Sequence, residues 1–275
     1  MEFGDSPASI DARPFPFHVL TLFPAMIRQA VGHSILGRAI ERRLIEVVAT
    51  DIRDFTHDRH RTADDVPYGG GAGMVMKVEP LAESLRSIRP SAPDAPVVLL
   101  SPSGRQFDQA TARRYATGPG VILVCGHYEG VDDRFRERFV DEELSIGDYV
   151  VSGGELPALV VLDAVARLVP GVLGNRSSLA DESHDDGLLE YPQYTRPAEF
   201  EGLAVPDVLM SGNHAAVARY RKEKRLEKTR QNRPDLWQRL PPEVREPPVR
   251  ASSRSRRPVQ LGRPFDARQP PDRES

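Results

Sequence analysis

Cysteine and long apolar runs are scarce in this sequence. Its 275 residues include one cysteine, Cys125, so the chain forms neither an intramolecular disulfide nor a zinc site built from cysteines. The most apolar stretch of helix length, residues 156–173, carries Asp163 and Arg167 near its middle, which excludes it as a transmembrane helix. We therefore expect a fold held by side-chain packing, with Cys125 as a small buried hydrophobic residue.

A signal peptide is also lacking. The N-terminal sequence MEFGDSPASIDARP has no apolar segment of the kind that a secretory signal contains. Without such a signal or a membrane span, the protein is predicted to be cytoplasmic and to have no membrane partner. Residues 1–15 are expected to be a disordered extension.

An excess of positive charge is missing from the chain as a whole. The 37 Lys and Arg residues against 40 Asp and Glu give a net charge of −3, which argues against nucleic-acid binding over the whole surface. The charges are unevenly distributed, however, because residues 211–275 carry +9 and residues 1–210 carry −12. A basic end on an acidic body predicts a polyanionic partner.

Apolar runs of strand length recur along the first half of the chain, at residues 17–23, 47–52, 96–100 and 121–126. Segments with helical character lie between them, at residues 26–44 and 108–114, and an apolar helix is expected at residues 156–169. Continuous apolar strands that alternate with helices are typical of a parallel sheet covered on both faces. The predicted class is α/β, with residues 53–77 as a long loop.

The second half of the chain divides by composition. After a main domain at residues 16–174, the polar and acidic segment 175–197 is predicted to be an interdomain linker. Residues 198–240 are predicted to form a helical domain around a helix at 214–232, with Asn213 and its neighbours as the cap. Residues 241–275 contain 8 Pro and 8 Arg, and this composition predicts a disordered tail.

A glycine-rich stretch, YGGGAGM at residues 68–74, is typical of loops that let backbone N–H groups approach a phosphate. It lacks the lysine of a nucleoside-triphosphate loop and the third glycine of a dinucleotide fingerprint, so by itself it indicates a flexible loop. Arg59 and His60 lie in a neighbouring basic and aromatic segment that is suited to RNA. His57 and His60 have no glutamate in the position that a zinc motif requires, and we predict no metal site.

Three further glycine-bearing motifs, GHYEG at 126–130, SIGDY at 145–149 and SGGELP at 152–157, each follow a strand-like run. In a parallel sheet such loops meet at one edge, and together they predict a ligand crevice. Each motif also has a purely structural interpretation. Ser152 and Glu155 have the spacing of a helix capping box, and Asp163 and Arg167 have that of an i,i+4 ion pair.

These motifs together resemble a known family. DFTHDRHR at 54–61, PYGGG at 67–71, the three motifs just described, PGVLG at 170–174, YTRP at 194–197 and LMSGNH at 209–214 are similar to the bacterial tRNA (guanine-N1)-methyltransferases of the TrmD family, over roughly residues 17–240. The resemblance implies a SPOUT-type α/β fold with a deep trefoil knot, rare among proteins, and a small helical C-terminal domain. It also implies a homodimer with its active sites at the subunit interface.

The implied reaction transfers the methyl group of S-adenosyl-L-methionine to N1 of the guanine at position 37 of tRNA. By motif, the residues that bind this cofactor are Leu100, Ser101, Gly126, Tyr128, Gly130, Ile146, Gly147, Asp148, Tyr149, Val150, Val151, Gly153, Gly154 and Pro157. Glu129 is in the position that contacts the target guanine. The residues expected to contact tRNA are Arg59 and His60, and Arg221, Arg225 and Lys228 on one predicted helix face.

The catalytic base is the point at which this sequence departs from the family. The family has an aspartate in the linker, and counting back from GLL at residues 187–189 places Glu182 there, with Asp181 one residue earlier. Either carboxylate could take the guanine N1 proton. Arg167 matches the arginine that stabilises negative charge on guanine O6. The alternative, motivated by Glu182, is a tRNA-binding protein of the same fold that has lost transfer activity.

Overall fold

The computed structural model describes residues 13–173, 183 and 186–245. The chain divides into two compact units, Met1–Asp185 and Asp186–Ser275, which are described one at a time. No helix in the described ranges is long and apolar enough to cross a membrane.

The first unit is built on a five-stranded sheet in the order β2-β1-β6-β5-β7, and every neighbouring pair in it is parallel. Its strands are β1 (Phe15–Thr21), β2 (Ile45–Asp51), β5 (Val97–Gln106), β6 (Val121–Cys125) and β7 (Glu142–Ser145). Strand pairing therefore confirms the predicted α/β class with a parallel sheet. β1 begins at Phe15, two residues before the apolar run that predicted it.

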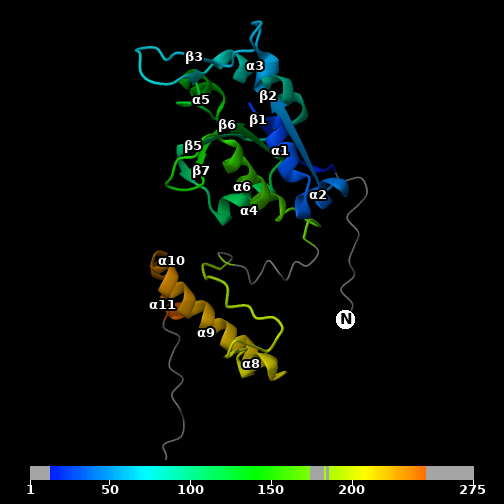
Figure 1. Cartoon of the computed structure of the whole chain (residues 1–275), viewed down its shortest axis with the longest axis vertical. Helices are drawn as coiled ribbons and strands as arrows, with labels where there is room; N and C mark the ends of the chain where they lie inside the picture. Colours follow the sequence, from blue (N-terminus) through cyan, green and yellow to red (C-terminus); the bar gives the residue numbers. More distant parts are fainter. Residues whose placement is uncertain (1–12, 174–182, 184–185, 246–275) are drawn as a thin grey trace, which may run out of the picture. The chain divides into compact units, whose positions relative to one another are not determined.

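Helices cover both faces of this sheet, as predicted. In Figure 1, α3 (Val78–Ile88) and α5 (Asp133–Phe139) lie on one face, and α2 (Ser34–Glu41), α4 (Gln109–Ala116) and α6 (Glu155–Ala166) lie on the other, with α1 (Pro24–Val31) beside α6. Successive strand residues point to opposite faces. Val19 and Leu123 thus belong to one buried cluster, and Leu20 and Val124 to the other.

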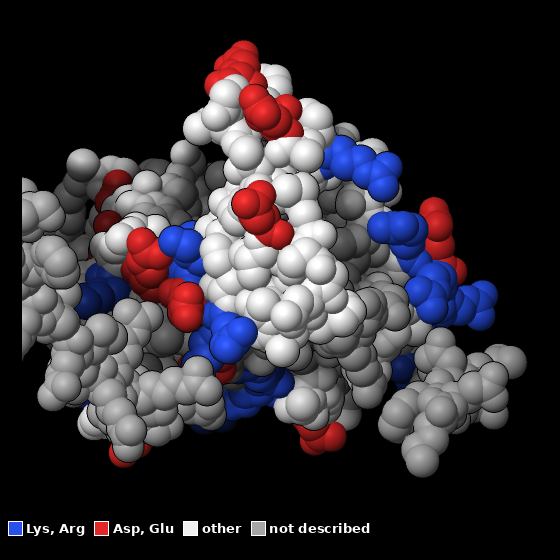
Figure 2. Space-filling view, turned by 90° about the horizontal axis from the view of Figure 1, so that it is seen from below, with Lys and Arg blue, Asp and Glu red and all other residues white. Residues whose placement is uncertain are grey.

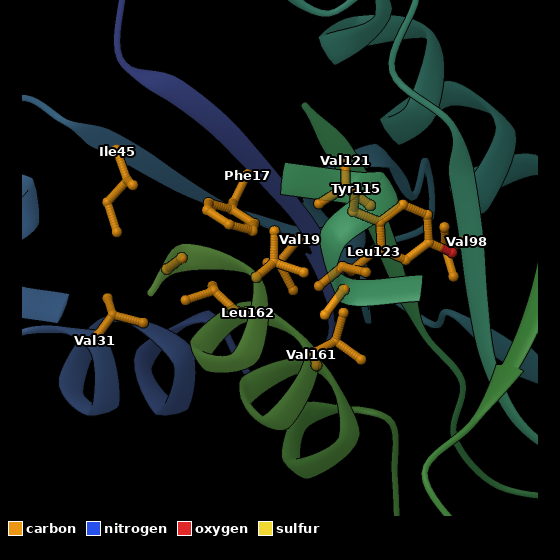
Figure 3. Close-up of a cluster of buried hydrophobic side chains, with 14 of the residues drawn as sticks. Phe17, Val19, Val31, Ile45, Val98, Tyr115, Val121, Leu123, Val161 and Leu162 are labelled. Carbon is orange, nitrogen blue, oxygen red and sulfur yellow. The ribbon is translucent and has the colours of Figure 1, made fainter. Parts of the chain in front are cut away.

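The larger cluster joins α6 to the strands. Figure 3 shows Val161 and Leu162 of α6 facing Val19 and Leu123, with Phe17 alongside. Cys125 is completely buried in the same cluster, which confirms its predicted place in the core. Burial and the nearby Glu155 raise the pKa of its thiol well above the usual range.

Two predictions for the first unit are wrong. Residues 26–44 do not form one helix, because α1 ends at Val31 and α2 starts at Ser34, whose φ of 54° cannot continue a helix. Residues 53–77 are not one long loop. They contain the end of the 3-10 helix η1 (Ile52–Phe55) and an antiparallel pair of β3 (Asp64–Asp65) with β4 (Val75–Met76). A second 3-10 helix, η2 (Arg89–Ser91), follows α3.

Within residues 186–245, the described part of the second unit, there are a short hairpin and four helices. β8 (Glu199–Phe200) pairs with β9 (Leu203–Ala204), and α8 (Asp207–Met210), α9 (His214–Asn232), α10 (Pro234–Arg239) and α11 (Pro242–Arg245) follow. The bounds of α9 are those predicted, and its N-terminus is capped by the Asn213 side chain, which accepts a hydrogen bond from the N–H of Ala216 at 3.1 Å.

Two segments lie at boundaries of the predicted domains, which stay predictions. Residues 186–191, placed in the linker, lie against α9, where the N–H of Leu189 donates to Thr229 Oγ1 at 2.8 Å and Leu188 is buried. At the start of the predicted tail, α11 occupies residues 242–245. Pro242 opens that helix, where its missing N–H costs no hydrogen bond.

Candidate active site

A cavity of about 320 Å³ lies between the middle of β5 and the ends of β6 and β7. Its walls come from residues 99–103, 126–131, 144–147, 149–154 and 157. The three glycine-bearing motifs therefore share one crevice at the carboxyl edge of the sheet, where parallel α/β proteins bind ligands. Every residue predicted to bind the cofactor lines this cavity except Asp148. Their role as cofactor ligands remains a prediction.

Backbone packing shapes the floor of the cavity. The N–H of Gly154 donates to the carbonyl oxygen of Gly126 at 2.9 Å, and a Cβ atom at residue 154 would lie 2.5 Å from the Cα of Cys125. Only glycine allows so close an approach between this turn and the end of β6. SGGELP was expected to follow a strand-like run. It comes instead after the loop 146–151.

A buried carboxylate lies next to the floor. Glu155, the first residue of α6, is 3% exposed. Its Oε2 atom is 2.6 Å from Nε2 of His127, and its Oε1 atom accepts a hydrogen bond from Oγ1 of Thr21 at 2.5 Å. The capping-box interpretation is therefore wrong, because Gly154 is the N-cap and no side chain caps this helix.

His127 lines the cavity, yet sequence reasoning did not select it. A signal for it was present in the sequence. His127 in GHYEG and Glu155 in SGGELP are ionisable, and both motifs were assigned to one crevice. Leu99, Pro102, Ser103, Val131, Leu144, Ser145 and Ser152 also line the cavity and were missed. Most of these are direct chain neighbours of selected residues.

Glu129 lies in the cavity wall, and the glycine-rich stretch lies against it. The N–H of Glu129 donates to the carbonyl oxygen of Met74 at 3.0 Å, and the N–H of Met76 donates to the carbonyl oxygen of Gly130 at 2.9 Å. A Cβ atom on Gly73, whose φ is +81°, would lie 2.3 Å from Glu129 Oε1. The glycine-rich stretch, which by itself indicated a flexible loop, is thus hydrogen-bonded at its C-terminal end to the loop that carries Glu129.

Comparison with known proteins identifies the family of the chain. Residues 15–239 match the family model described as tRNA (Guanine-1)-methyltransferase TrmD. The chain belongs to this family. The resemblance that the motifs indicated is thereby confirmed over most of the chain.

Close relatives carry the same description. The tRNA (guanine-N(1)-)-methyltransferase of Chloroflexus aggregans is 59% identical over 221 residues, which cover 80% of this chain and 86% of the relative. That of Methylococcus capsulatus is 57% identical over 221 residues, covering 80% and 88%. That of Geobacter metallireducens is 56% identical over 220 residues, covering 80% and 90%.

Arg59 and His60 lie outside the cavity of this TrmD-family chain. Both are exposed in the turn after η1, where the N–H of His60 donates to Asp58 Oδ1 at 2.8 Å. Hydrogen bonds from Thr62 and His60 lower the pKa of Asp58. His57 pairs with Glu83 at 3.0 Å. In the part of the chain that the structure describes, no three His, Cys, Asp or Glu side chains are grouped as metal ligands.

Arg167, the predicted catalytic arginine, is not near the cavity of its own chain. It is half-buried at the C-cap of α6, while the cavity lies at the N-terminal end of that helix. Pro157 of α6 lines the cavity, and the rise from Pro157 to Arg167 is about 15 Å, at about 1.5 Å per residue. Asp181 and Glu182 lie outside the described residues.

The predicted tRNA face of α9 turns toward its own chain. Arg225 binds both carboxylate oxygens of Asp186, at 2.9 and 2.5 Å, and its side chain is 12% exposed. Arg221 stacks over the ring of Tyr191, with 4.6 Å between the guanidinium carbon and the ring centroid. Lys228, the third predicted residue, is half-buried.

Other cations on α9 are freely accessible. Arg219, Lys222 and Arg230 are exposed, and Arg219 and Arg230 lie three turns apart on the same side of the helix. Figure 2 shows Lys and Arg side chains in several small groups, most of them with Asp or Glu beside them. The positive charge is therefore confined to small groups of residues. Those on α9 can be tested one set at a time for RNA binding.

Proposed function

We propose that this chain transfers the methyl group of S-adenosyl-L-methionine to N1 of guanosine-37 in tRNA, next to the anticodon. The observation that carries the proposal is the cavity between the middle of β5 and the ends of β6 and β7, lined by all but one of the predicted cofactor residues and by Glu129. Membership of the TrmD family and relatives named tRNA (guanine-N(1)-)-methyltransferases support the same reaction.

The cavity has the character that this cofactor requires. Its volume, about 320 Å³, is within the range of about 300–1,000 Å³ typical of small-molecule sites. Leu100, Ile146 and Pro157 offer apolar surface for the adenine faces, while backbone groups of the glycine loops can read its edge. When bound, S-adenosyl-L-methionine supplies a methyl group carried on a sulfonium.

The chain's own side chains then prepare the guanine. Its N1 atom carries a proton and is a poor nucleophile until that proton leaves, and we assign Glu182 as the carboxylate that takes it. Glu129, in the cavity wall, can accept a hydrogen bond from the guanine amine and so orient the base. Arg167 stabilises the negative charge that grows on O6 as the proton departs.

A homodimer fits the position of Arg167. This residue lies about 15 Å along α6 from Pro157 in the cavity of its own chain, so it would serve the cavity of a second subunit. Leu156 and Val160, one turn apart on α6, are 52% and 48% exposed. Phe23 and Tyr149 add further exposed apolar surface, and exposed apolar patches are typical of protein interfaces.

The deep trefoil knot belongs to the same proposal. A Cβ atom on Gly104 would lie 2.3 Å from the backbone nitrogen of Leu144, and one on Gly154 would lie 2.5 Å from Cys125 Cα. The knot itself is proposed from membership of the TrmD family. We further propose a cytoplasmic protein with a main domain at 16–174 and a small helical C-terminal domain within 198–240 that holds the tRNA.

The methyl-transfer assay tests this function directly. Transcripts of one tRNA with guanine or adenine at position 37 are incubated with the protein and labelled S-adenosyl-L-methionine, and label is expected only in the guanine transcript. Calorimetry with the cofactor, and with ATP as a control, is run on the same preparation. Cofactor binding without transfer would instead support the inactive tRNA-binding alternative.

The two faces of α9 give opposite expectations for tRNA affinity. Replacing Arg219, Lys222 and Arg230 by Gln is expected to weaken tRNA binding and to flatten the dependence of affinity on salt, because each phosphate contact releases counterions. The matched variant replaces Arg221, Arg225 and Lys228 by Gln. This second variant is expected to leave the salt dependence of tRNA affinity unchanged. It is expected to lower the melting temperature, because Arg225 holds Asp186.

Filter binding at several salt concentrations and thermal denaturation separate the two sets. An unchanged salt slope in the first variant would assign tRNA binding to another surface. If only the second variant changes the slope while it remains folded, the inward-facing residues are the tRNA ligands, as the sequence predicted.

A further inference from the structure

Three side chains next to the cavity form a buried polar cluster that the proposed chemistry does not use. Glu155 is 3% exposed and Thr21 is fully buried, while the His127 side chain is 14% exposed. One carboxylate oxygen of Glu155 meets His127 Nε2 at 2.6 Å, and the other accepts from Thr21 Oγ1 at 2.5 Å. We refer to these three residues as the Glu155 cluster.

The Glu155 cluster joins three separate parts of the first unit. Thr21 ends β1, His127 lies in the loop after β6, and Glu155 begins α6. Thr21 Oγ1 also accepts from the N–H of Phe23 at 2.8 Å, and the ring centroids of Phe23 and His127 are 5.1 Å apart. A change at any one of the three residues is therefore transmitted to the other two segments.

Packing leaves His127 little freedom to move. A Cβ atom on Gly153 would lie 2.1 Å from His127 Cε1, so the imidazole is in direct contact with the backbone of that glycine. An antiparallel bridge also connects residues 127 and 153. The imidazole is thus held between Gly153 on one side and Glu155 at its Nε2 atom, and the loop 126–130 is fixed through it.

A buried pair of this kind adds little net stability, because well-packed apolar residues usually serve as well. In the described structure, the ionisable groups next to Glu155 are the His127 imidazole and the Cys125 thiol. What the pair does provide is geometry, since it fixes two loops that line the same cavity.

We propose that Glu155 is a positioning residue, which holds His127 and through it the loop 126–130 in the conformation that receives the methyl donor and presents Glu129 to the guanine. Tyr128 in this loop has a φ of 60°, a conformation that side-chain-bearing residues adopt only when their surroundings hold them there. This inference rests on the proposed function, because it names the same cavity as the cofactor site.

The test compares Glu155→Gln, His127→Gln and the double variant. We expect each single variant to bind S-adenosyl-L-methionine about 10- to 100-fold more weakly by calorimetry, as displaced binding groups do. The double variant is expected to be no weaker than the weaker single one, because both changes break the same link. The KM for tRNA stays unchanged and kcat falls, because tRNA affinity depends mainly on phosphate contacts elsewhere.

Glu142→Gln is the matched control for stability. Glu142 forms a two-pronged ion pair with Arg114, at 2.7 Å for both contacts, and does not line the cavity. The substitution Glu142→Gln is expected to lower the melting temperature without changing the affinity for S-adenosyl-L-methionine. If Glu142→Gln weakens cofactor binding as much as Glu155→Gln does, the effect is general destabilisation and the inference is wrong.

Thr21 supplies a second test in case a variant at residue 155 fails to fold. Thr21→Val removes the hydroxyl and is expected to weaken cofactor binding, while Thr21→Ser keeps the hydroxyl and is expected to restore it. Equal affinities for these two variants and the wild type would overturn the inference. A wild-type protein that does not bind S-adenosyl-L-methionine would contradict the proposed function itself, so the two failures are distinguishable.

Discussion

Glu182→Gln is expected to lower the rate of methyl transfer by about 10²–10⁴-fold, the usual contribution of a general base. The amide has nearly the shape of the carboxylate but cannot accept the guanine N1 proton. Affinity for S-adenosyl-L-methionine is expected to stay at the wild-type level, because every described residue that lines the cavity is unchanged. Single-turnover transfer and calorimetry on the same preparation measure the two quantities.

Asp181→Asn is the matched control, since it removes the neighbouring carboxylate with an equally small change of shape. It should transfer the methyl group at nearly the wild-type rate. The opposite pattern, with Asp181→Asn inactive and Glu182→Gln active, would move the base by one residue. Normal rates in both variants would refute a linker carboxylate as the base.

Gly154→Ala is expected to abolish measurable cofactor binding and to cost about 1–3 kcal/mol of folding free energy, the typical penalty for overpacking. The new methyl group would lie 2.5 Å from Cys125 Cα and 2.9 Å from the backbone nitrogen of Gly126. Both are backbone atoms of a buried strand end, which cannot rotate away as a flexible side chain can. Either the turn 153–154 or the loop 126–130 must shift, and both line the cavity.

Gly32→Ala is a suitable control for this substitution. Its nearest neighbour would be the carbonyl oxygen of Arg28 at 3.5 Å, an ordinary contact, and its φ of −73° suits alanine. Thermal denaturation and calorimetry are expected to give the wild-type melting temperature and cofactor affinity for Gly32→Ala. Both quantities are expected to fall in Gly154→Ala. Normal cofactor affinity in folded Gly154→Ala would show that this turn does not shape the binding site.

Local patterns were sufficient for the sheet and for much of the cavity. Val121–Cys125 is an apolar run of strand length, and the run Val97–Leu100 resembles it, so both were identified as strands of a covered sheet. The glycine motifs that follow such strands are readable because residue type alone indicates a turn. Strand direction then brings these motifs to one edge without any knowledge of packing.

Features that depend on neighbours distant in sequence were predicted poorly. The spacing of Ser152 and Glu155 suits a capping box, yet Glu155 pairs with His127 and Thr21, which are 28 and 134 residues away. Arg225 shares a helix face with two other cations, and only the structure shows that Asp186, 39 residues away, binds it; its predicted role in tRNA binding stays a prediction. A helical wheel shows which residues share a face, and only packing shows what that face contacts.

The sequence by itself determined the α/β class, the family and the loops that form the cavity, because strand periodicity, glycine turns and long motifs are local properties of the chain. Tertiary structure alone decided which charges are used inside the protein. The direction of Glu155 toward Thr21 and His127, and of Arg225 toward Asp186, depends on burial and on partners that approach from other elements. A buried charge must find such a partner or lose its hydration without compensation.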